Sequence, residues 1–224
     1  MPARRPKASD PTVVLFVRHG QTPTTGTVLP GRAAGLHLAE EGRAQAEAAA
    51  GRIAALSAPP NPRSKPRVDA VYASPLERAA ETAAPIAAAL GLSVTTDEGL
   101  LECEFGEWTG AELKSLAKLA EWSTVQRWPS GWRFPGGESF SEMQARMLRC
   151  VNDLRATHPG GCVVAVSHAD PIKAVLAHAL GTHLDLFQRI VVSPCSVSAV
   201  AYGDAGPRVL AVNSTSSLAE LRPS

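Results

Sequence analysis

Two arginines and two histidines of this sequence stand at or shortly after the ends of short apolar segments. Arg18 and His19 follow VVLFV, Arg78 comes soon after VDAVYA, and His168 follows CVVAVS. A guanidinium is a forked, permanently charged donor that matches the geometry of phosphate oxygens. An imidazole between two such cations has its charged form disfavoured and keeps a nitrogen lone pair available. This set of side chains predicts nucleophilic attack on phosphorus.

The elements that must position these residues follow from hydrophobic patterning. Residues 13–17, 68–73 and 162–167 are typical of strands buried on both faces, and residues 38–56 have helical spacing. The alternation predicts an α/β fold, a three-layer αβα sandwich with a mostly parallel central sheet. Further elements are expected elsewhere: helices at 74–90, 139–158 and 170–181, a short strand at 92–97, and a closing antiparallel pair at 197–203 and 208–213.

Local signals mark the ends of two of these helices. Ser74 is the expected N-cap of the helix at 74–90, Pro75 suits its first helical position, and Gly91 ends it. Ser139 or Ser141 lies near the start of the helix at 139–158.

The expected convergence of the strand ends is the reason to consider the four side chains together. A single histidine after a strand, or an arginine on a helix such as Arg78, is more often structural than catalytic. In open α/β sheets, however, ligands bind beyond the carboxyl ends of the strands, where loops and helix N-termini meet. We therefore expect Arg18, His19, Arg78 and His168 to face one crevice.

Four ordered motifs carry a resemblance to a known family. VRHGQT, SPLERAAETA, LLECEFGEW and VSHADPI together resemble the histidine phosphatase superfamily, also called phosphoglycerate mutase-like, from about residue 13 to residue 213. The resemblance implies the phosphoglycerate mutase-like sandwich and an enzyme that needs no metal or other cofactor.

The resemblance also implies roles for individual residues. His19 is similar in position to the nucleophile that forms a phosphohistidine, and Arg18, Arg78 and His168 to the residues around the phosphoryl group. Glu102 resembles the family's proton donor. The chemistry agrees, because phosphoryl transfer needs cationic groups around the equatorial oxygens, here two arginines and a protonated His168. The leaving alkoxide needs a carboxylic acid with a raised pKa.

Two neighbouring carboxylates are rivals of Glu102 for the acid role. If the segment EFGEW is extended, Glu104 lies on the same side as Glu102, whereas Glu107 points the other way. The alternative for both rivals is ion pairing at the surface or in a loop. Gly20 is expected to let the backbone approach a bound phosphate, because it has no Cβ atom; the alternative is an ordinary turn glycine.

Departures from the family pattern favour a phosphatase. Mutases of the family typically carry a tyrosine after the acid glutamate and an Asn soon after the second histidine, where this chain has Phe105 and Asp170. We expect hydrolysis of a small phosphorylated metabolite, with phosphoglycerate mutase-type transfer as the alternative. A second alternative is a non-catalytic protein that binds a phosphorylated ligand.

An insertion or lid is expected around residues 110–138. Its segment 122–138 carries aromatic side chains and two arginines, Arg127 and Arg133, that suit an anionic substrate. The aromatic residues would either wall a pocket over the phosphate or pack against one another; they are Trp122, Trp128, Trp132 and Phe134.

Composition narrows the class of partner. The chain has 22 Lys and Arg against 21 Asp and Glu, so neither nucleic acid nor a membrane is expected as a partner. The basic stretch 1–11 lacks the apolar core of a signal peptide and is expected to be a disordered tail before a single domain at 12–224. Oligomeric state leaves no signal in the sequence. Four cysteines without metal or redox spacing predict free thiols and a cytoplasmic location: Cys103, Cys150, Cys162 and Cys195.

Overall fold

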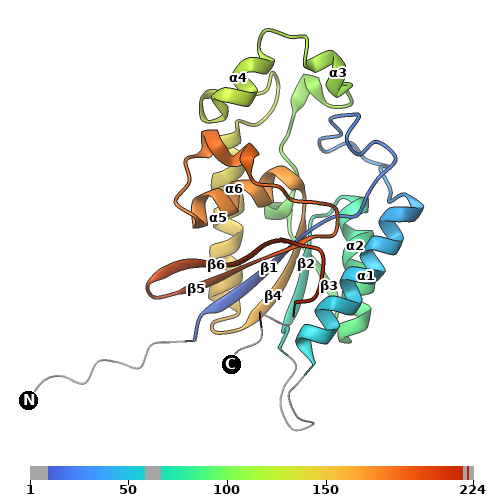
Figure 1. Ribbon diagram of the computed structural model, residues 1–224, viewed down its shortest axis with the longest axis vertical. Coiled ribbons are helices and arrows are strands. Elements are labelled where there is room, and N and C mark those ends of the chain that lie inside the picture. Colours follow the sequence, from blue (N-terminus) through green and yellow to red (C-terminus); the bar gives the residue numbers. More distant parts are fainter. Residues whose placement is uncertain (1–9, 59–66, 219–220, 222–224) are drawn as a thin grey trace, which may run out of the picture.

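A six-stranded sheet forms the centre of the molecule (Figure 1). The computed structural model describes residues 10–58, 67–218 and 221. The strand order is β3-β2-β4-β1-β5-β6. The strands are β1 (Thr12–Arg18), β2 (Ala70–Ala73), β3 (Val94–Thr96), β4 (Cys162–Ser167), β5 (Val197–Gly203) and β6 (Gly206–Ser214).

Strand direction divides the sheet into a parallel part and an antiparallel edge. β3, β2, β4 and β1 pair in parallel, whereas β5 is antiparallel to β1 and β6 is antiparallel to β5. Every residue of β4 is buried, as a strand covered on both faces requires. The predicted α/β fold with a mostly parallel sheet and a closing antiparallel pair is confirmed.

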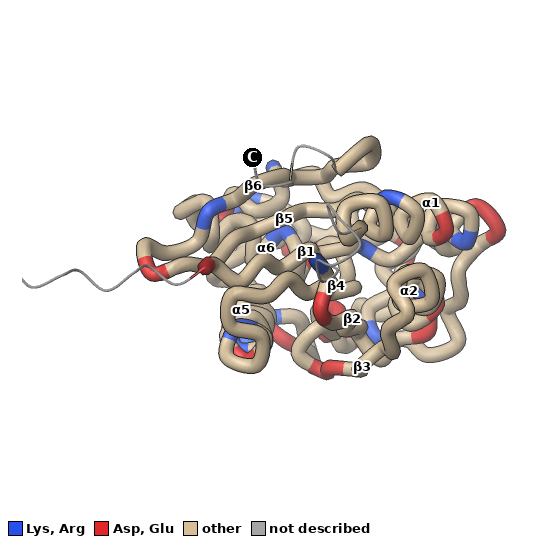
Figure 2. Tube along the Cα trace, turned by 90° about the horizontal axis from the view of Figure 1, so that it is seen from below, with Lys and Arg blue, Asp and Glu red and all other residues tan. Residues whose placement is uncertain are grey.

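Helices cover both faces of the sheet, as Figure 2 shows end-on. α1 (Glu40–Ser57) and α2 (Glu77–Leu90) pack on one face, against the side chains of β1 and β4 that point to that face, such as Val17. α5 (Phe140–Thr157) and α6 (Ala169–Ala179) pack on the other, against alternate residues such as Phe16. The period of two along each strand therefore supplies two separate cores.

Helix ends agree with the sequence at some places and not at others. Gly91 ends α2 in the left-handed region with φ 66°, and Ser139 begins α5 in a reciprocal capping box with Glu142. The expected cap at Ser74 is wrong: α2 begins at Glu77, and its N-cap residue makes no side-chain cap hydrogen bond. The hydroxyl group of Ser74 has a different partner, described below.

The segment 110–138, where an insertion or lid is expected, lies beyond the carboxyl end of the parallel strands, at the top of Figure 1. It contains α3 (Leu113–Leu116) and α4 (Trp122–Arg127). Of the two expected arrangements, mutual packing of the aromatic rings is observed: Trp132 and Phe134 pack against Trp108, with ring centroids 5.3 and 5.5 Å from it. Trp122 stacks on Trp108 at 6.2 Å, whereas the ring of Trp128 is mostly exposed.

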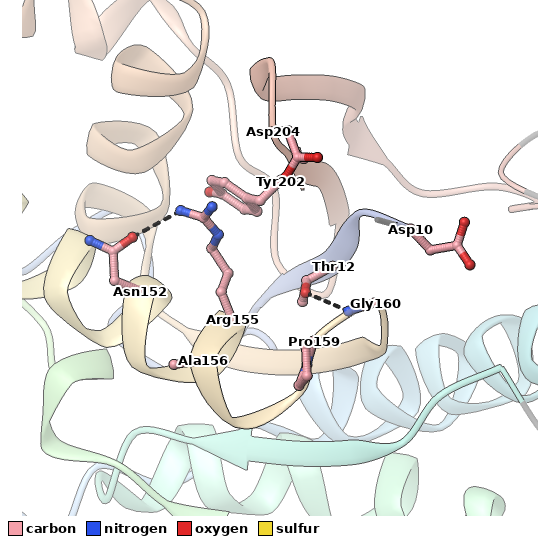
Figure 3. Close-up of a pocket in the computed structure, with 10 residues that line it drawn as sticks. Asp10, Thr12, Asn152, Arg155, Ala156, Pro159, Gly160, Tyr202 and Asp204 are labelled. Carbon is pink, nitrogen blue, oxygen red and sulfur yellow. Dashed lines mark hydrogen bonds between the residues drawn. The ribbon is translucent and has the colours of Figure 1, made fainter. Parts of the chain in front are cut away.

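A hollow of about 590 Å³ lies at the other end of the sheet, beside the start of β1 (Figure 3). Its lining includes Thr12, Arg155 and Tyr202, and the guanidinium of Arg155 lies over the Tyr202 ring at 5.1 Å from its centroid. None of the four converging arginines and histidines lines this hollow.

The remaining predictions concern the tail, the cysteines and the membrane. Residues 1–9 of the predicted tail lie outside the described residues, whereas Asp10 and Pro11 are placed directly before β1. Within the described ranges, no helix combines the length and the apolar character that crossing a bilayer requires. The predicted free thiols are confirmed, because all four cysteines are buried and unbridged.

Candidate active site

The ends of three adjacent strands bring the four predicted side chains together. The backbone of His19 donates to the carbonyl of Ser167 at 2.9 Å, so the pairing of β1 with β4 continues to the first turn beyond the sheet. The backbone of Ser74, after β2, donates in the same way to Val166 at 2.9 Å. The rings of His19 and His168 then lie 5.1 Å apart, centroid to centroid.

His19 is held in one tautomer. Its side chain is buried, and Nδ1 lies 2.7 Å from the carbonyl oxygen of Gly20. A carbonyl only accepts, so Nδ1 carries the proton and Nε2 carries the lone pair. Burial, followed by the charges of Arg78 and Arg18, lowers the pKa of His19 to about 3. The ring is therefore neutral and nucleophilic at neutral pH.

The two arginines keep buried donors unused. Arg78 is fully buried and donates from Nη2 to the carbonyl of Gly31 at 2.7 Å, while its Nε and Nη1 have no hydrogen-bond partner among the described residues. Arg18 donates from Nη1 to the carbonyl of Val192 at 2.8 Å, and its buried Nε likewise has no partner there. Buried cationic donors are costly unless an anion satisfies them, so these groups indicate an anion site.

His168 adds a second ring with an unused nitrogen. Its Nε2 lies 2.8 Å from Oγ of Ser74, and its buried Nδ1 has no partner in the described part of the chain. Burial, followed by the charge of Arg78, lowers the pKa of His168 well below its usual value. The expectation of a protonated His168 is therefore wrong for the free site. A neutral ring that accepts from the Ser74 hydroxyl still presents Nδ1–H as a donor.

Glu102 has the properties of a proton donor at neutral pH. It follows the short 3₁₀ helix η1 (Glu98–Leu100) and is buried, and its Oε1 accepts from the backbone of Cys103 at 2.9 Å. Burial, followed by the negative charge of Asp170, raises the pKa of Glu102 to about 7. The nearby charges of Arg78 and Arg18 act in the opposite direction and are outweighed.

The rival carboxylates lie elsewhere. The segment after Glu102 is not extended, because Phe105 has φ −84° and ψ 0° and leads into the 3₁₀ helix η2 (Gly106–Trp108). Glu104 is partly exposed and pairs with Arg32, whose Nε lies 3.6 Å from Oε2. Glu107 is exposed. The condition under which Glu104 would share the side of Glu102 is therefore not met, and ion pairing is the observed role of Glu104.

Gly20 is required by packing within the protein. A Cβ atom there would lie 2.5 Å from the carbonyl oxygen of Gly42 in α1. Its backbone N–H donates to Oγ1 of Thr82 at 3.0 Å, and the Thr82 hydroxyl donates to the carbonyl of Arg78 at 2.7 Å. Thr82 thus ties the loop after β1 to the turn of α2 that carries Arg78. Close approach of Gly20 to a bound phosphate stays a prediction.

Three residues near the site were missed or misread from the sequence. The prediction of a helix cap at Ser74 overlooks that this residue directly follows a buried strand. That position is the signal that links Ser74 to the site. Asp170 was read only as a departure from the mutase pattern, although it lies two residues after His168. Thr82 gave no signal beyond its place in SPLERAAETA. Three other histidines make contacts away from the site, His37 with Glu81, His158 with Tyr72 and His183 with Asp185, and His178 is exposed on α6.

The fold and the site define an α/β protein in which buried arginine donors without a partner among the described residues surround a neutral imidazole. A model of the histidine phosphatase superfamily (branch 1) matches residues 14–215. Phosphoserine phosphatase 1 of Hydrogenobacter thermophilus is 29% identical over 214 residues, which cover 92% of this chain and 94% of that protein. The native structure of a mycobacterial glucosyl-3-phosphoglycerate phosphatase superposes with a TM-score of 0.78 at 25% identity, covering 93% of this chain and 100% of that one.

The chain belongs to the histidine phosphatase superfamily, branch 1. The predicted membership of the histidine phosphatase superfamily is thereby confirmed. Bifunctional protein Rv2228c of Mycobacterium tuberculosis is 34% identical over 214 residues, which make up 92% of this chain but 54% of that relative. This chain thus spans about half the length of that curated relative.

Replacing Asp170 should change the titration of Glu102. Removing a like charge eases ionisation, so Asp170→Asn should lower the pKa of Glu102 below the wild-type value of about 7. The measurement is a ¹³C NMR titration of the glutamate carboxyl groups, with Glu102→Gln to assign the signal. An unchanged midpoint in Asp170→Asn would show that the two carboxyl groups do not interact.

Replacing Ser74 should weaken anion binding by the site. Ser74→Ala removes the hydroxyl that holds the proton of His168 on Nδ1, so the ring loses a fixed donor to a bound anion, and a hydrogen bond to a charged group contributes about 1.5–3 kcal/mol. We expect roughly tenfold weaker binding of inorganic phosphate by calorimetry. Ser57→Ala is the matched control, because it removes a buried hydroxyl that accepts from Val68 far from the site. Equal phosphate affinity in both variants would contradict the role of Ser74.

Proposed function

We propose that this protein hydrolyses phosphate monoesters through a phosphohistidine at His19. The observation that carries the proposal is the neutral, buried imidazole between two arginines whose buried donors have no partner among the described residues. Such donors match the equatorial oxygens of a phosphoryl group in transfer. Nε2 is the ring nitrogen of His19 that has a free lone pair, because Nδ1 donates a hydrogen bond to the carbonyl oxygen of Gly20.

The proposed reaction has two half-steps. Donors of Arg18, Arg78 and His168 bind the phosphoryl oxygens, and Nε2 of His19 attacks phosphorus. The bond from phosphorus to the ester oxygen breaks, and Glu102 gives its proton to that oxygen as it leaves as an alcohol. Water then attacks phospho-His19, Glu102 takes a proton from the water, and inorganic phosphate leaves with His19 and Glu102 restored. No step calls for a metal ion.

We infer a small phosphorylated metabolite as the substrate. Relatives of this chain include proteins named as phosphatases of phosphoserine and of glucosyl-3-phosphoglycerate, which supports that size class. Water is the proposed acceptor, since Phe105 is buried in the aromatic cluster and brings no hydroxyl group to retain an intermediate for transfer. The four buried free thiols support a reducing, cytoplasmic location.

Replacing His19 tests this proposal. His19→Ala should lower phosphate release from a panel of sugar, glycerate, amino acid and aryl phosphates by at least about a thousandfold, because no other group forms the covalent intermediate. Wild-type activity should survive EDTA. His178→Ala is the control, because it removes an exposed histidine of α6 and should keep wild-type activity.

Four outcomes would contradict the proposal. Full activity in His19→Ala would exclude the nucleophile, and loss with EDTA would exclude a metal-independent reaction. Conversion of 3-phosphoglycerate to 2-phosphoglycerate faster than phosphate release, with 2,3-bisphosphoglycerate present, would indicate a mutase. Thermal stabilisation by phosphorylated ligands without any turnover would indicate a binding protein.

A further inference from the structure

A charged cluster of Arg32, Glu138 and Arg146 packs against the backbone of the segment that carries Glu102. Glu138 binds Arg146 in a bidentate pair, with Nε to Oε1 at 2.9 Å and Nη2 to Oε2 at 3.0 Å. The same Oε2 accepts from Nη2 of Arg32 at 2.9 Å. The side chains come from the loop after β1, the residue before the α5 cap, and the second turn of α5. They are largely buried, with exposed fractions of 26%, 15% and 16%.

The two arginines use their other donors on the backbone around Glu102. Nε of Arg32 donates to the carbonyl of Glu102 at 2.8 Å, and Nη2 of Arg146 donates to the same oxygen at 3.2 Å. Nη1 of Arg146 donates to the carbonyls of Gly99 at 2.8 Å and Leu101 at 3.0 Å. Arg146 alone therefore fixes three carbonyl groups of the segment that carries Glu102.

Glu138 holds the other side of the same segment. Its Oε2 accepts from the backbone of Glu104 at 3.2 Å, and its own backbone donates to the carbonyl of Glu104 at 2.8 Å. Residues 101–104 belong to no helix or strand, so no regular ladder fixes them. The cluster supplies the hydrogen bonds that a ladder would otherwise provide.

From these contacts we infer that Arg32, Glu138 and Arg146 are positioning residues that place the carboxyl group of Glu102 for protonation of the leaving group. The inference rests on the proposed function, in which Glu102 is the acid. A displacement of about 1 Å in a catalytic group costs up to about a hundredfold in rate. Within the described residues, no hydrogen bond joins the cluster to His19 or to the partnerless donors of Arg18 and Arg78. The charge of Arg146 does act on His168, so a substitution that keeps this charge should spare the binding of phosphate and the attack on phosphorus.

Dependence on the leaving group separates positioning from general structural damage. Phenolate needs a proton as it leaves, whereas 2,4-dinitrophenolate is stable enough to leave without one. Arg146→Lys keeps the positive charge but loses the planar fork, so the electrostatics of the site are preserved while the three carbonyls lose fixed donors. We expect kcat/KM to fall about tenfold or more for phenyl phosphate and less than about twofold for 2,4-dinitrophenyl phosphate.

Matched variants complete the experiment. Arg149→Lys changes an exposed arginine one turn further along α5 and should behave as wild type with both substrates. Arg32→Lys removes the second donor to the Glu102 carbonyl from a different segment, and it should show the same selective loss if Arg146→Lys does not fold. Circular dichroism and the phosphate dissociation constant check that each variant keeps the fold and the anion site.

Glu102→Gln distinguishes failure of the inference from failure of the proposed function. It should lose phenyl phosphate activity selectively and by a larger factor than Arg146→Lys. The acid role itself would be overturned if Glu102→Gln lost activity to the same extent with both substrates, or lost activity with neither. The positioning role alone would be overturned by a different result. In that case Glu102→Gln loses phenyl phosphate activity selectively, but the folded Arg146→Lys or Arg32→Lys variant loses activity equally with both substrates or with neither.

Discussion

The burial of two guanidinium groups beside a neutral imidazole is the constraint on which the site depends. Arg78 is fully buried with donors that have no partner in the described chain, and its charge is one reason why His19 does not accept a proton. Burying charge in this way costs stability, and the rest of the molecule must offset that cost. A bound phosphoryl group would offset this cost, so the buried charges favour the binding of an anion.

The architecture maintains this arrangement by three kinds of contact. Parallel pairing of β2, β4 and β1 brings the loops after three strands to one edge of the sheet. Backbone contact between Gly20 and Gly42 and the hydrogen bonds of Thr82 hold the loop after β1 against α1 and α2. The Arg32, Glu138 and Arg146 cluster does the same for the irregular segment around Glu102. Regular structure therefore places the buried arginines and histidines, and side-chain contacts place the segment that carries Glu102.

The sequence predicts the periodic part of this structure well. Apolar runs and helical spacing identified the strands, the layers and the convergence of Arg18, His19 and His168, because these depend on local periodicity and on a general property of parallel sheets. Contacts between residues far apart in the chain were not predictable in this way. The pairing of Ser74 with His168 and the effect of Asp170 on Glu102 depend on distances that only the folded chain sets.

The protonation state of His19 is the central claim, and ¹⁵N NMR of its ring measures it most directly. Signals of the protein labelled in its histidine rings would be assigned by comparison with His19→Ala. We predict a neutral ring with the proton on Nδ1 and no protonation from pH 8 down to about pH 5, because burial and the two arginine charges lower the pKa to about 3. Titration near the ordinary value of 6.5, or a proton on Nε2 at neutral pH, would contradict it.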